Sequence, residues 1–373
     1  MPITIPPQLL PADGRFGSGP SKVRQEAVER LAVAAGALLG TSHRQAGVKA
    51  QVRRVREGLR AFFSLPDDYQ VILGNGGATL FWDAAAHCLI ARRSAHAVFG
   101  EFSGKFARVV TAAPFLDDPV IAESPPGSHP EMAAQLGVDL YALTHCETST
   151  GVAMPIRRPG PDGLVAVDAT SGAGGIEFDL AEVDAYYFSP QKSFGSEGGL
   201  FIALMSPPAI ERVETIRASG RYIPAMLDLG LAAQNSAKDQ TLNTPSIATL
   251  FLMGEQLDWL NEQGGLAAAA KDCAAKATIL YDWAENRPWA TPFVADPAMR
   301  SPVICTLDLD PSVPAASVTT ALRANGILDT EAYRNLGRNQ LRVAVFPAVT
   351  LADVERLTAA IDYVVERVAA SRA

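Results

Sequence analysis

The sequence predicts an α/β protein with a mostly parallel sheet, followed by a smaller α+β domain. The chain has 373 residues, which is enough for two packed domains. Over its first two thirds, short apolar runs alternate with helical patterns, as in parallel sheets that are covered by helices. Several runs are continuously apolar rather than alternating, which indicates strands buried on both faces.

The N-terminal part is expected to hold an arm and two helices. Residues 1–20 are rich in Pro and Gly and are expected to be extended. A helical pattern begins at Ser21 and closes at Gly40, which suits a C-cap. A second helix is expected over residues 48–63, and we interpret its arginines as a solvated face. These arginines are Arg53, Arg54, Arg56 and Arg60.

Apolar runs then predict the strands of the sheet. They cover residues 70–73, 95–99, 139–144, 164–167, 185–188 and 200–205. In sheets of this type, ligands bind at the carboxyl ends of the strands. Polar segments follow four of the runs, at residues 74–79, 145–150, 168–175 and 189–192.

After Pro245 the pattern changes to long helices with two strands. Helices are expected at residues 246–261, 266–285, 315–325 and 351–370, and strands at 303–309 and 341–346. We therefore predict an arm of residues 1–20, a large domain of residues 21–255 and a small domain of residues 256–373.

Composition argues against several classes of protein. A net charge of −8 and a pI of about 5.2 argue against non-specific binding to nucleic acid or to an anionic membrane. The four cysteines are scattered, which argues against a disulfide framework or a metal site. The N-terminus lacks the features of a signal peptide, and no apolar run has the length of a membrane span. A soluble, reduced, cytoplasmic protein is expected.

Lys192 stands in a polar turn after the fifth apolar run. A lysine at the end of a buried strand can form a Schiff base if its pKa is lowered. Asp168 closes the preceding run, where a carboxylate can cap a turn or pair with a pyridine nitrogen. Because the two residues follow neighbouring runs, at the carboxyl ends of two predicted strands, we favour pyridoxal phosphate as the cofactor.

A glycine-rich segment joins the first predicted strand to a helix. Its residues Gly76, Gly77, Ala78 and Thr79 would let the backbone approach a phosphate at the helix N-terminus. A tight turn without a ligand is the alternative, since the segment matches neither the Walker A nor the dinucleotide motif.

Six motifs occur in one order along the chain, at residues 16–20, 41–44, 147–151, 168–171, 189–192 and 243–245. Together they resemble the phosphoserine aminotransferase family, whose members are fold-type I pyridoxal phosphate enzymes. The resemblance covers residues 14–346 and looks closest to the actinobacterial branch. It implies a mostly parallel seven-stranded sheet in the large domain, and a homodimer with active sites shared across the interface.

The resemblance also implies roles for individual residues. Lys192 would carry the cofactor and move the proton, and Asp168 would pair with the pyridine nitrogen. Further cofactor contacts would come from Ala78, Thr79, Phe102, Thr148 and Gln191, and across the dimer from Asn243 and Thr244. Substrate contacts would come from His43, Arg44, Arg338 and Arg342, of which Arg342 would hold the α-carboxylate.

Three departures from the family pattern stand out. Phe102 occupies the place of a stacking tryptophan and offers less ring area and no N–H. Cys146 replaces an asparagine and is expected to be a buried thiol. A second His-Arg pair lacks its histidine, so that Arg338 is the candidate for its arginine.

The leading hypothesis is transamination between L-glutamate and 3-phosphohydroxypyruvate, which gives O-phospho-L-serine and 2-oxoglutarate. Preference for the related phosphorylated hydroxythreonine of pyridoxine biosynthesis stays open, because both substrates carry a phosphate and an α-carboxylate. The alternative is another fold-type I pyridoxal phosphate enzyme, such as a different class V aminotransferase, a lyase or a cysteine desulfurase. A desulfurase would need a reactive thiol, and the apolar flanks of Cys305 argue against one. Intact Lys192 and Asp168 argue against an inactive binding protein.

Overall fold

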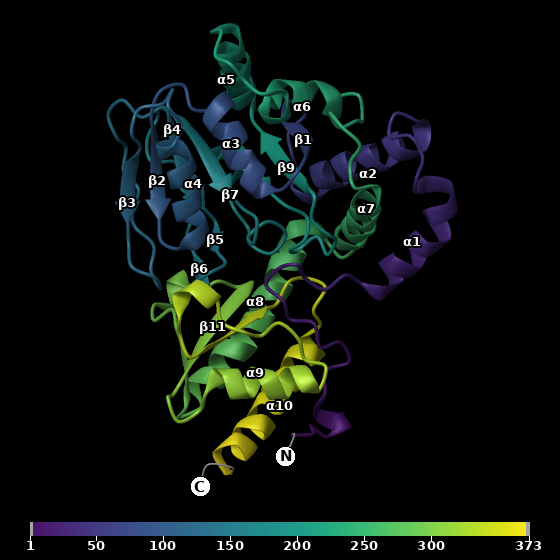
Figure 1. Cartoon of the computed structure of the whole chain (residues 1–373), viewed down its shortest axis with the longest axis vertical. Coiled ribbons are helices and arrows are strands. Elements are labelled where there is room, and N and C mark those ends of the chain that lie inside the picture. Colours follow the sequence, from purple (N-terminus) through teal and green to yellow (C-terminus); the bar gives the residue numbers. More distant parts are fainter. Residues whose placement is uncertain (1–2, 371–373) are drawn as a thin grey trace.

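The computed structural model describes residues 3–370. The first two residues of the predicted arm and residues 371–373 of the predicted small domain lie outside the described part. Figure 1 shows a large sheet with its helices in the upper part of the molecule and a small sheet with its helices below. The arm runs along the lower part, which also holds the C-terminal helix.

Within the described residues, the large sheet has seven strands. Their spatial order is β1 (Gln70–Asn75), β9 (Leu200–Met205), β8 (Ala185–Phe188), β7 (Leu164–Asp168), β4 (Leu140–Thr144), β2 (Ser94–Val98) and β3 (Val120–Glu123). Strand β9 is antiparallel to both of its neighbours, and the pairs from β8 to β3 are parallel. The predicted mostly parallel, seven-stranded sheet is therefore confirmed.

The strands are apolar throughout because both faces of the sheet are covered. In β8, Tyr186 and Phe188 belong to one apolar cluster, and Ala185 and Tyr187 belong to the other. Helices α2 (Ala46–Phe62) and α7 (Ile247–Glu262) cover the first face. The second face carries α3 (Ala78–Cys88), α4 (Glu101–Thr111), α5 (Pro207–Ala218) and α6 (Leu229–Ser236).

The small sheet is antiparallel and has its own apolar cluster. Its strands are β10 (Ala290–Pro292), β11 (Ile304–Leu309) and β12 (Gln340–Ala344). The helices around it are α8 (Gly265–Glu285), α9 (Ala315–Ala324) and α10 (Leu351–Ala370). Ile5 and Phe16 of the arm are buried in this cluster, so the arm is part of the core here.

Short elements complete the described chain. They are helix α1 (Gln25–Leu38), the two-stranded ribbon of β5 (Cys146–Glu147) with β6 (Val152–Ala153), and 3-10 turns at Pro7–Leu9, Leu180–Glu182, Ala225–Leu227, Pro297–Met299 and Arg334–Leu336. The turn at Pro7–Leu9 interrupts the arm that was expected to be extended.

The structure corrects two expectations about individual segments. The arginines of α2 form a face that is only partly solvated. Arg53 stays 57% exposed while it pairs with Asp239, whereas the half-buried Arg54 and Arg56 pair with Glu255 and Asp239. Strand β3 was absent from the predicted runs. It lies at an edge of the sheet, where half of its four residues are exposed, so its sequence lacks a continuous apolar run.

Candidate functional site

The carboxyl ends of β7 and β8 bring Asp168 and Lys192 into one buried region. The two strands pair in parallel, Asp168 is the last residue of β7, and Lys192 follows β8 after a short turn. Only 6% of Asp168 and 9% of Lys192 is exposed. The charges of Asp168 and of the Arg342 guanidinium both act on the pKa of Lys192.

The amine of Lys192 meets the arm. Its Nζ donates a hydrogen bond to the carbonyl of Ser18, and Ser21 donates through Oγ to the carbonyl of Lys192. Gly19 has φ of 136°, a conformation that favours glycine, and a Cβ at this position would collide with the Lys192 side chain. Burial, and then the charge of Arg342, lowers the pKa of Lys192 to about 8. At pH 7 about a tenth of the amine is therefore neutral and nucleophilic, far more than for an ordinary lysine.

The carboxylate of Asp168 is held by two N–H donors. The backbone N–H of Thr170 donates to Oδ1 at 2.9 Å, and the indole N–H of Trp82 donates to Oδ2 at 3.1 Å. Burial raises the pKa of Asp168, whereas these hydrogen bonds oppose the rise. Asp168 therefore keeps acceptor capacity for a cationic ring N–H.

The glycine-rich segment lies between β1 and α3, as predicted. Gly76 has φ of 110°, a left-handed conformation that favours glycine. The N–H of Ala78 donates to Oγ of Ser189 at 2.7 Å, which ties the start of α3 to the turn that carries Lys192. The N-terminus of α3, where Ala78 and Thr79 lie, offers the N–H donors and dipole that suit a phosphate.

Thr148 and Phe102 are positioned by buried polar contacts. Oγ1 of Thr148 lies 2.5 Å from Oγ of Ser171. The fully buried carboxylate of Glu147 accepts hydrogen bonds from the N–H groups of Phe102, at 3.1 Å, and Ser103, at 2.9 Å. Glu147 therefore fixes the first turn of α4, which carries the Phe102 ring.

Arg342 is a half-buried cation without a carboxylate partner among the described residues. Its Nη1 donates to the carbonyl of Thr148 at 3.1 Å, and its guanidinium lies 5.4 Å from the ring centre of Tyr333. Its Nε is buried and makes no hydrogen bond in the structure. Burial lowers the pKa of this guanidinium.

The other predicted substrate residues contact different parts of the chain. Arg338 pairs with both oxygens of Asp308 and stacks on the ring of Phe293 at 4.5 Å, so that its role in binding substrate stays a prediction. His43 lies beside Thr244, with 3.0 Å between Nδ1 and Oγ1, and Arg44 donates to Gln240.

Asn243 and Thr244 lie at the flank of the glycine-rich segment of their own chain. The N–H of Asn243 donates to the side chain of Asn75, and the Asn75 amide donates to the carbonyl of Thr244. Gln191 lies in the turn of Lys192, and its Oε1 is buried without a hydrogen-bond partner. The cofactor contacts of these three predicted residues stay predictions.

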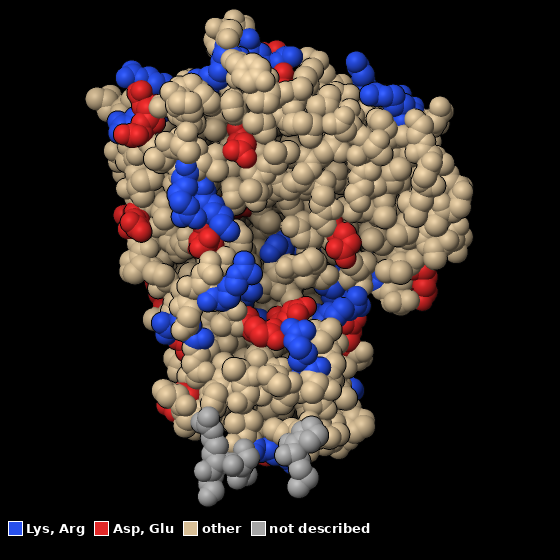
Figure 2. Space-filling view, in the orientation of Figure 1, with Lys and Arg blue, Asp and Glu red and all other residues tan. Residues whose placement is uncertain are grey.

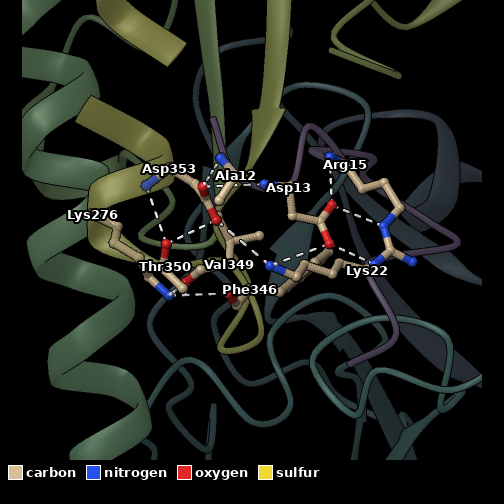
Figure 3. A network of polar contacts seen from close by, with 9 residues as sticks. All are labelled: Ala12, Asp13, Arg15, Lys22, Lys276, Phe346, Val349, Thr350 and Asp353. Atoms are coloured by element: carbon tan, nitrogen blue, oxygen red, sulfur yellow. Dashed lines mark hydrogen bonds and ion pairs between the residues drawn. The ribbon is translucent and has the colours of Figure 1, made fainter. Parts of the chain in front are cut away.

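A polar network anchors the arm to the start of α10 (Figure 3). Asp353 is 2% exposed, and its carboxylate accepts hydrogen bonds from the N–H groups of Ala12, at 2.7 Å, and Asp13, at 3.3 Å. Lys22 lies between the carboxylates of Asp13 and Asp353, at 3.5 and 3.6 Å. The anchored segment is the one whose Ser18 accepts the hydrogen bond from the amine of Lys192.

Figure 2 shows lysine and arginine side chains around a hollow at the middle of the face shown, between the large upper and the small lower part. A cavity of about 250 Å³ at the start of α4 is lined by Gly100, Ser149 and Tyr333, the ring under Arg342. A larger cavity of about 690 Å³ lies beside the arm and contains none of the predicted site residues.

Other kinds of site receive no support from residues 3–370. Among them, no group of three or more His, Cys, Asp or Glu side chains could hold a metal ion. No helix in this range is long and apolar enough to cross a membrane. All four cysteines are free and buried, and burial raises the pKa of each to about 12. Cys146 is the expected buried thiol, and none of these thiols suits a desulfurase.

Two contributors to the site were not found from the sequence. Trp82 lies one helical turn after Ala78, so that the 3.6-residue period could have placed it on the same face of the predicted helix. Glu147 stood in a motif that was recognised, but its contacts with α4 depend on the folding of two distant segments.

The comparisons with known proteins agree with this geometry. The model of the "Aminotransferase class-V" family matches residues 130–338. A phosphoserine aminotransferase of a Nocardioides species is 57% identical over 368 residues, which covers 98% of each chain. The crystal structure of a phosphoserine aminotransferase from Cytophaga hutchinsonii has a TM-score of 0.87 at 23% identity and covers 94% of this chain and 99% of that chain. A pyridoxal phosphate-bound phosphoserine aminotransferase from Trichomonas vaginalis has a TM-score of 0.80 at 18% identity, covering 94% and 99% of the two chains. The chain therefore belongs to the class-V aminotransferases and, among them, to the phosphoserine aminotransferase family.

Proposed function

We propose that this protein transfers the amino group between L-glutamate and 3-phosphohydroxypyruvate, giving O-phospho-L-serine and 2-oxoglutarate for L-serine biosynthesis. The name of its 57% identical relative supports this reaction. The observation that carries the proposal is the grouping of Lys192, Asp168 and Arg342 in one buried region. These residues supply a nucleophilic amine, an anion and a carboxylate-binding cation.

The residues of the site fit pyridoxal phosphate as the cofactor. The N-terminus of α3, with Ala78 and Thr79, suits the phosphate, and Asp168 suits the ring nitrogen. Lys192 suits the aldehyde of the cofactor. The buried Oε1 of Gln191 has no partner and can accept a hydrogen bond from a donor at the cofactor site. When bound, the cofactor supplies an electron sink for negative charge at the α-carbon of the substrate.

The residues of the chain bind and orient the substrate and move its α-proton. The Nε of Arg342 has no other hydrogen-bond partner, which supports a bidentate contact between this guanidinium and the α-carboxylate. Lys192, with a pKa of about 8, can take the α-proton and return it near neutral pH. The arm packs against its Nζ through Ser18 and limits the access of water.

Further cofactor contacts come from Thr148 and Phe102. The hydroxyl of Thr148 suits a contact with the side of the cofactor ring that carries the phenolic oxygen. The face of Phe102 suits stacking on the ring, and Glu147 holds its backbone in place.

The proposed assembly is a homodimer in which each copy completes the site of the other. His43, Arg44, Asn243 and Thr244 would supply the cross-subunit contacts to the cofactor phosphate and the substrate. The contact between Thr244 and His43 supports the proposal that both residues reach the same site of the partner subunit. Exposed apolar side chains on the adjoining helix α1, Val28 at 41% and Val33 at 90%, support a second copy at this surface.

We extend the proposed substrate range to 4-phosphohydroxy-L-threonine of pyridoxine biosynthesis, because it shares the phosphate and the α-carboxylate. We place the protein in the cytoplasm, which is supported by four cysteines that form no disulfide. Comparing kcat/KM for 3-phosphohydroxypyruvate and for the keto acid that corresponds to 4-phosphohydroxy-L-threonine would rank the substrates.

The test is the visible spectrum of the purified protein with pyridoxal phosphate. We expect L-glutamate to remove the absorption band and 3-phosphohydroxypyruvate to restore it. The Lys192→Ala variant should lose turnover while its oligomeric state stays unchanged. A band that L-glutamate does not alter, or normal turnover by this variant, would contradict the proposed reaction.

A further inference from the structure

We propose that Trp82 is a positioning residue for the cofactor, because its indole N–H fixes the carboxylate of Asp168. The inference rests on the proposed pairing of Asp168 with the ring nitrogen. Nε1 of Trp82 lies 3.1 Å from Oδ2 of Asp168, and 3% of the tryptophan is exposed. An indole N–H can only donate, so this contact requires an acceptor oxygen at Asp168.

The two donors act on different oxygens of one carboxylate. Thr170 donates to Oδ1 from the backbone, and Trp82 donates to Oδ2 from α3. Together they restrict the rotation of the carboxyl plane and stabilise its charged form. Burial acts in the opposite direction and raises the pKa of Asp168, so that the loss of one donor favours protonation. A protonated carboxyl group pairs poorly with a protonated ring nitrogen.

Helix α3 thereby serves both ends of the proposed cofactor site. Its N-terminus, at Ala78, faces the phosphate position, and Trp82 lies four residues later on the same side of the helix. The Trp82 ring stacks on Phe106 of α4, with 6.4 Å between the ring centres and 14° between their planes. One rigid element thus sets both the phosphate site and the orientation of Asp168.

The test uses cofactor-free protein and two probes that lack the aldehyde, so that Lys192 forms no bond with them. The first is 4′-deoxypyridoxine 5′-phosphate, and the second is its 1-deaza counterpart, which has a C–H in place of the ring nitrogen. We expect Trp82→Phe to weaken binding of the first probe about tenfold, the scale of a hydrogen bond to a charged group. Binding of the second probe should change little.

A matched control lies in the small part of the molecule. Nε1 of Trp283 donates to Oδ1 of Asp362 at 3.1 Å, so Trp283→Phe removes the same kind of bond of the same length. We expect it to leave both affinities unchanged. If the Trp82→Phe variant does not fold, β-(3-benzothienyl)alanine at position 82 replaces the N–H by sulfur and keeps the ring size, with the same expected result.

Equal weakening of both probes by the change at Trp82 would overturn the inference, because it would mean that only packing was lost. An unchanged affinity for the first probe would overturn it as well. The Asp168→Asn variant distinguishes a failure of the inference about Trp82 from a failure of the proposed pairing between Asp168 and the ring nitrogen. It should abolish the preference between the probes, and a retained preference would show that Asp168 does not pair with the ring nitrogen.

Discussion

Arg342 is fixed beside Thr148, because its Nη1 donates to the Thr148 carbonyl at 3.1 Å while its Nε stays buried and unpaired. A guanidinium with unused donors can bind a planar anion such as a carboxylate, the role proposed for Arg342. Both proposed substrates carry an α-carboxylate, so this arrangement should serve both halves of the reaction.

Arg342→Lys should therefore lower kcat/KM about tenfold to a hundredfold for L-glutamate and for 3-phosphohydroxypyruvate alike. Lysine keeps the charge and loses the bidentate fork. Steady-state kinetics with each substrate varied in turn measures the effect. Arg300→Lys is the matched control, since Arg300 also lies over an aromatic ring, at 5.2 Å from Tyr281. A loss restricted to one substrate would contradict the shared carboxylate site.

The pH dependence of cofactor uptake should report the amine of Lys192. The neutral amine is the nucleophile, and its fraction rises with pH until the pKa of about 8 is passed. The rate at which cofactor-free protein reacts with pyridoxal phosphate should thus rise with pH and level off above about 8. In Arg342→Gln the midpoint should move upward, because a positive neighbour that lowers this pKa is removed. Stopped-flow absorbance measures the rate, and a rise that continues toward 10.5, the ordinary lysine value, would contradict the prediction.

Glu147→Gln should destabilise the protein by about 1–3 kcal/mol. The carboxylate accepts from the N–H groups of Phe102 and Ser103 and from the hydroxyl of Ser149, at 2.7 Å. The glutamine amide would turn N–H groups toward some of these donors and would lose the charge at the N-terminus of α4. Urea unfolding measures the change. Glu214→Gln, at a half-exposed ion pair with Arg217, should change the free energy of unfolding far less.

The residues found from the sequence are those whose type and place along the chain are informative by themselves. Asp168 ends an apolar run and Lys192 follows the next run after a short turn, and a run of this kind marks a buried strand wherever it occurs. Arg342 stood out for its apolar flanks, which follow from its position in β12. In each case the signal is local.

Contacts between distant segments could not be predicted in the same way. The bond from Trp82 to Asp168 joins residues 86 positions apart and depends on how α3 packs on the sheet. The bond from Lys192 to Ser18 spans 174 positions. The predicted boundary after residue 255 stays a prediction, and α7 (Ile247–Glu262) runs through it without interruption.

The four thiols should not react with iodoacetamide in the folded protein. All are buried, and burial raises the pKa of each to about 12, so the thiolate fraction near neutral pH is very small. Mass spectrometry should find unmodified native protein with full activity, and four modified cysteines after unfolding. Rapid modification of Cys305 with loss of activity would instead favour a desulfurase.

Asp353→Ala should release the arm from the start of α10. The Asp353 carboxylate accepts from the N–H groups of Ala12 and Asp13 and lies 3.6 Å from Nζ of Lys22 (Figure 3). Hydrogen exchange of these two N–H groups should therefore become faster. Turnover should also fall, because the same segment places Ser18 against Lys192.

Asp362→Ala is the control for this prediction, since Asp362 is another carboxylate of α10 and pairs with Arg287 instead of the arm. It should lower the stability of the small part of the molecule without altering exchange at Ala12 and Asp13. Exchange measured by mass spectrometry on both variants separates the two effects. If Asp353→Ala left exchange in the arm unchanged while turnover fell, anchoring by Asp353 would not be what holds the arm at the lysine, and the loss would have to arise within α10 itself.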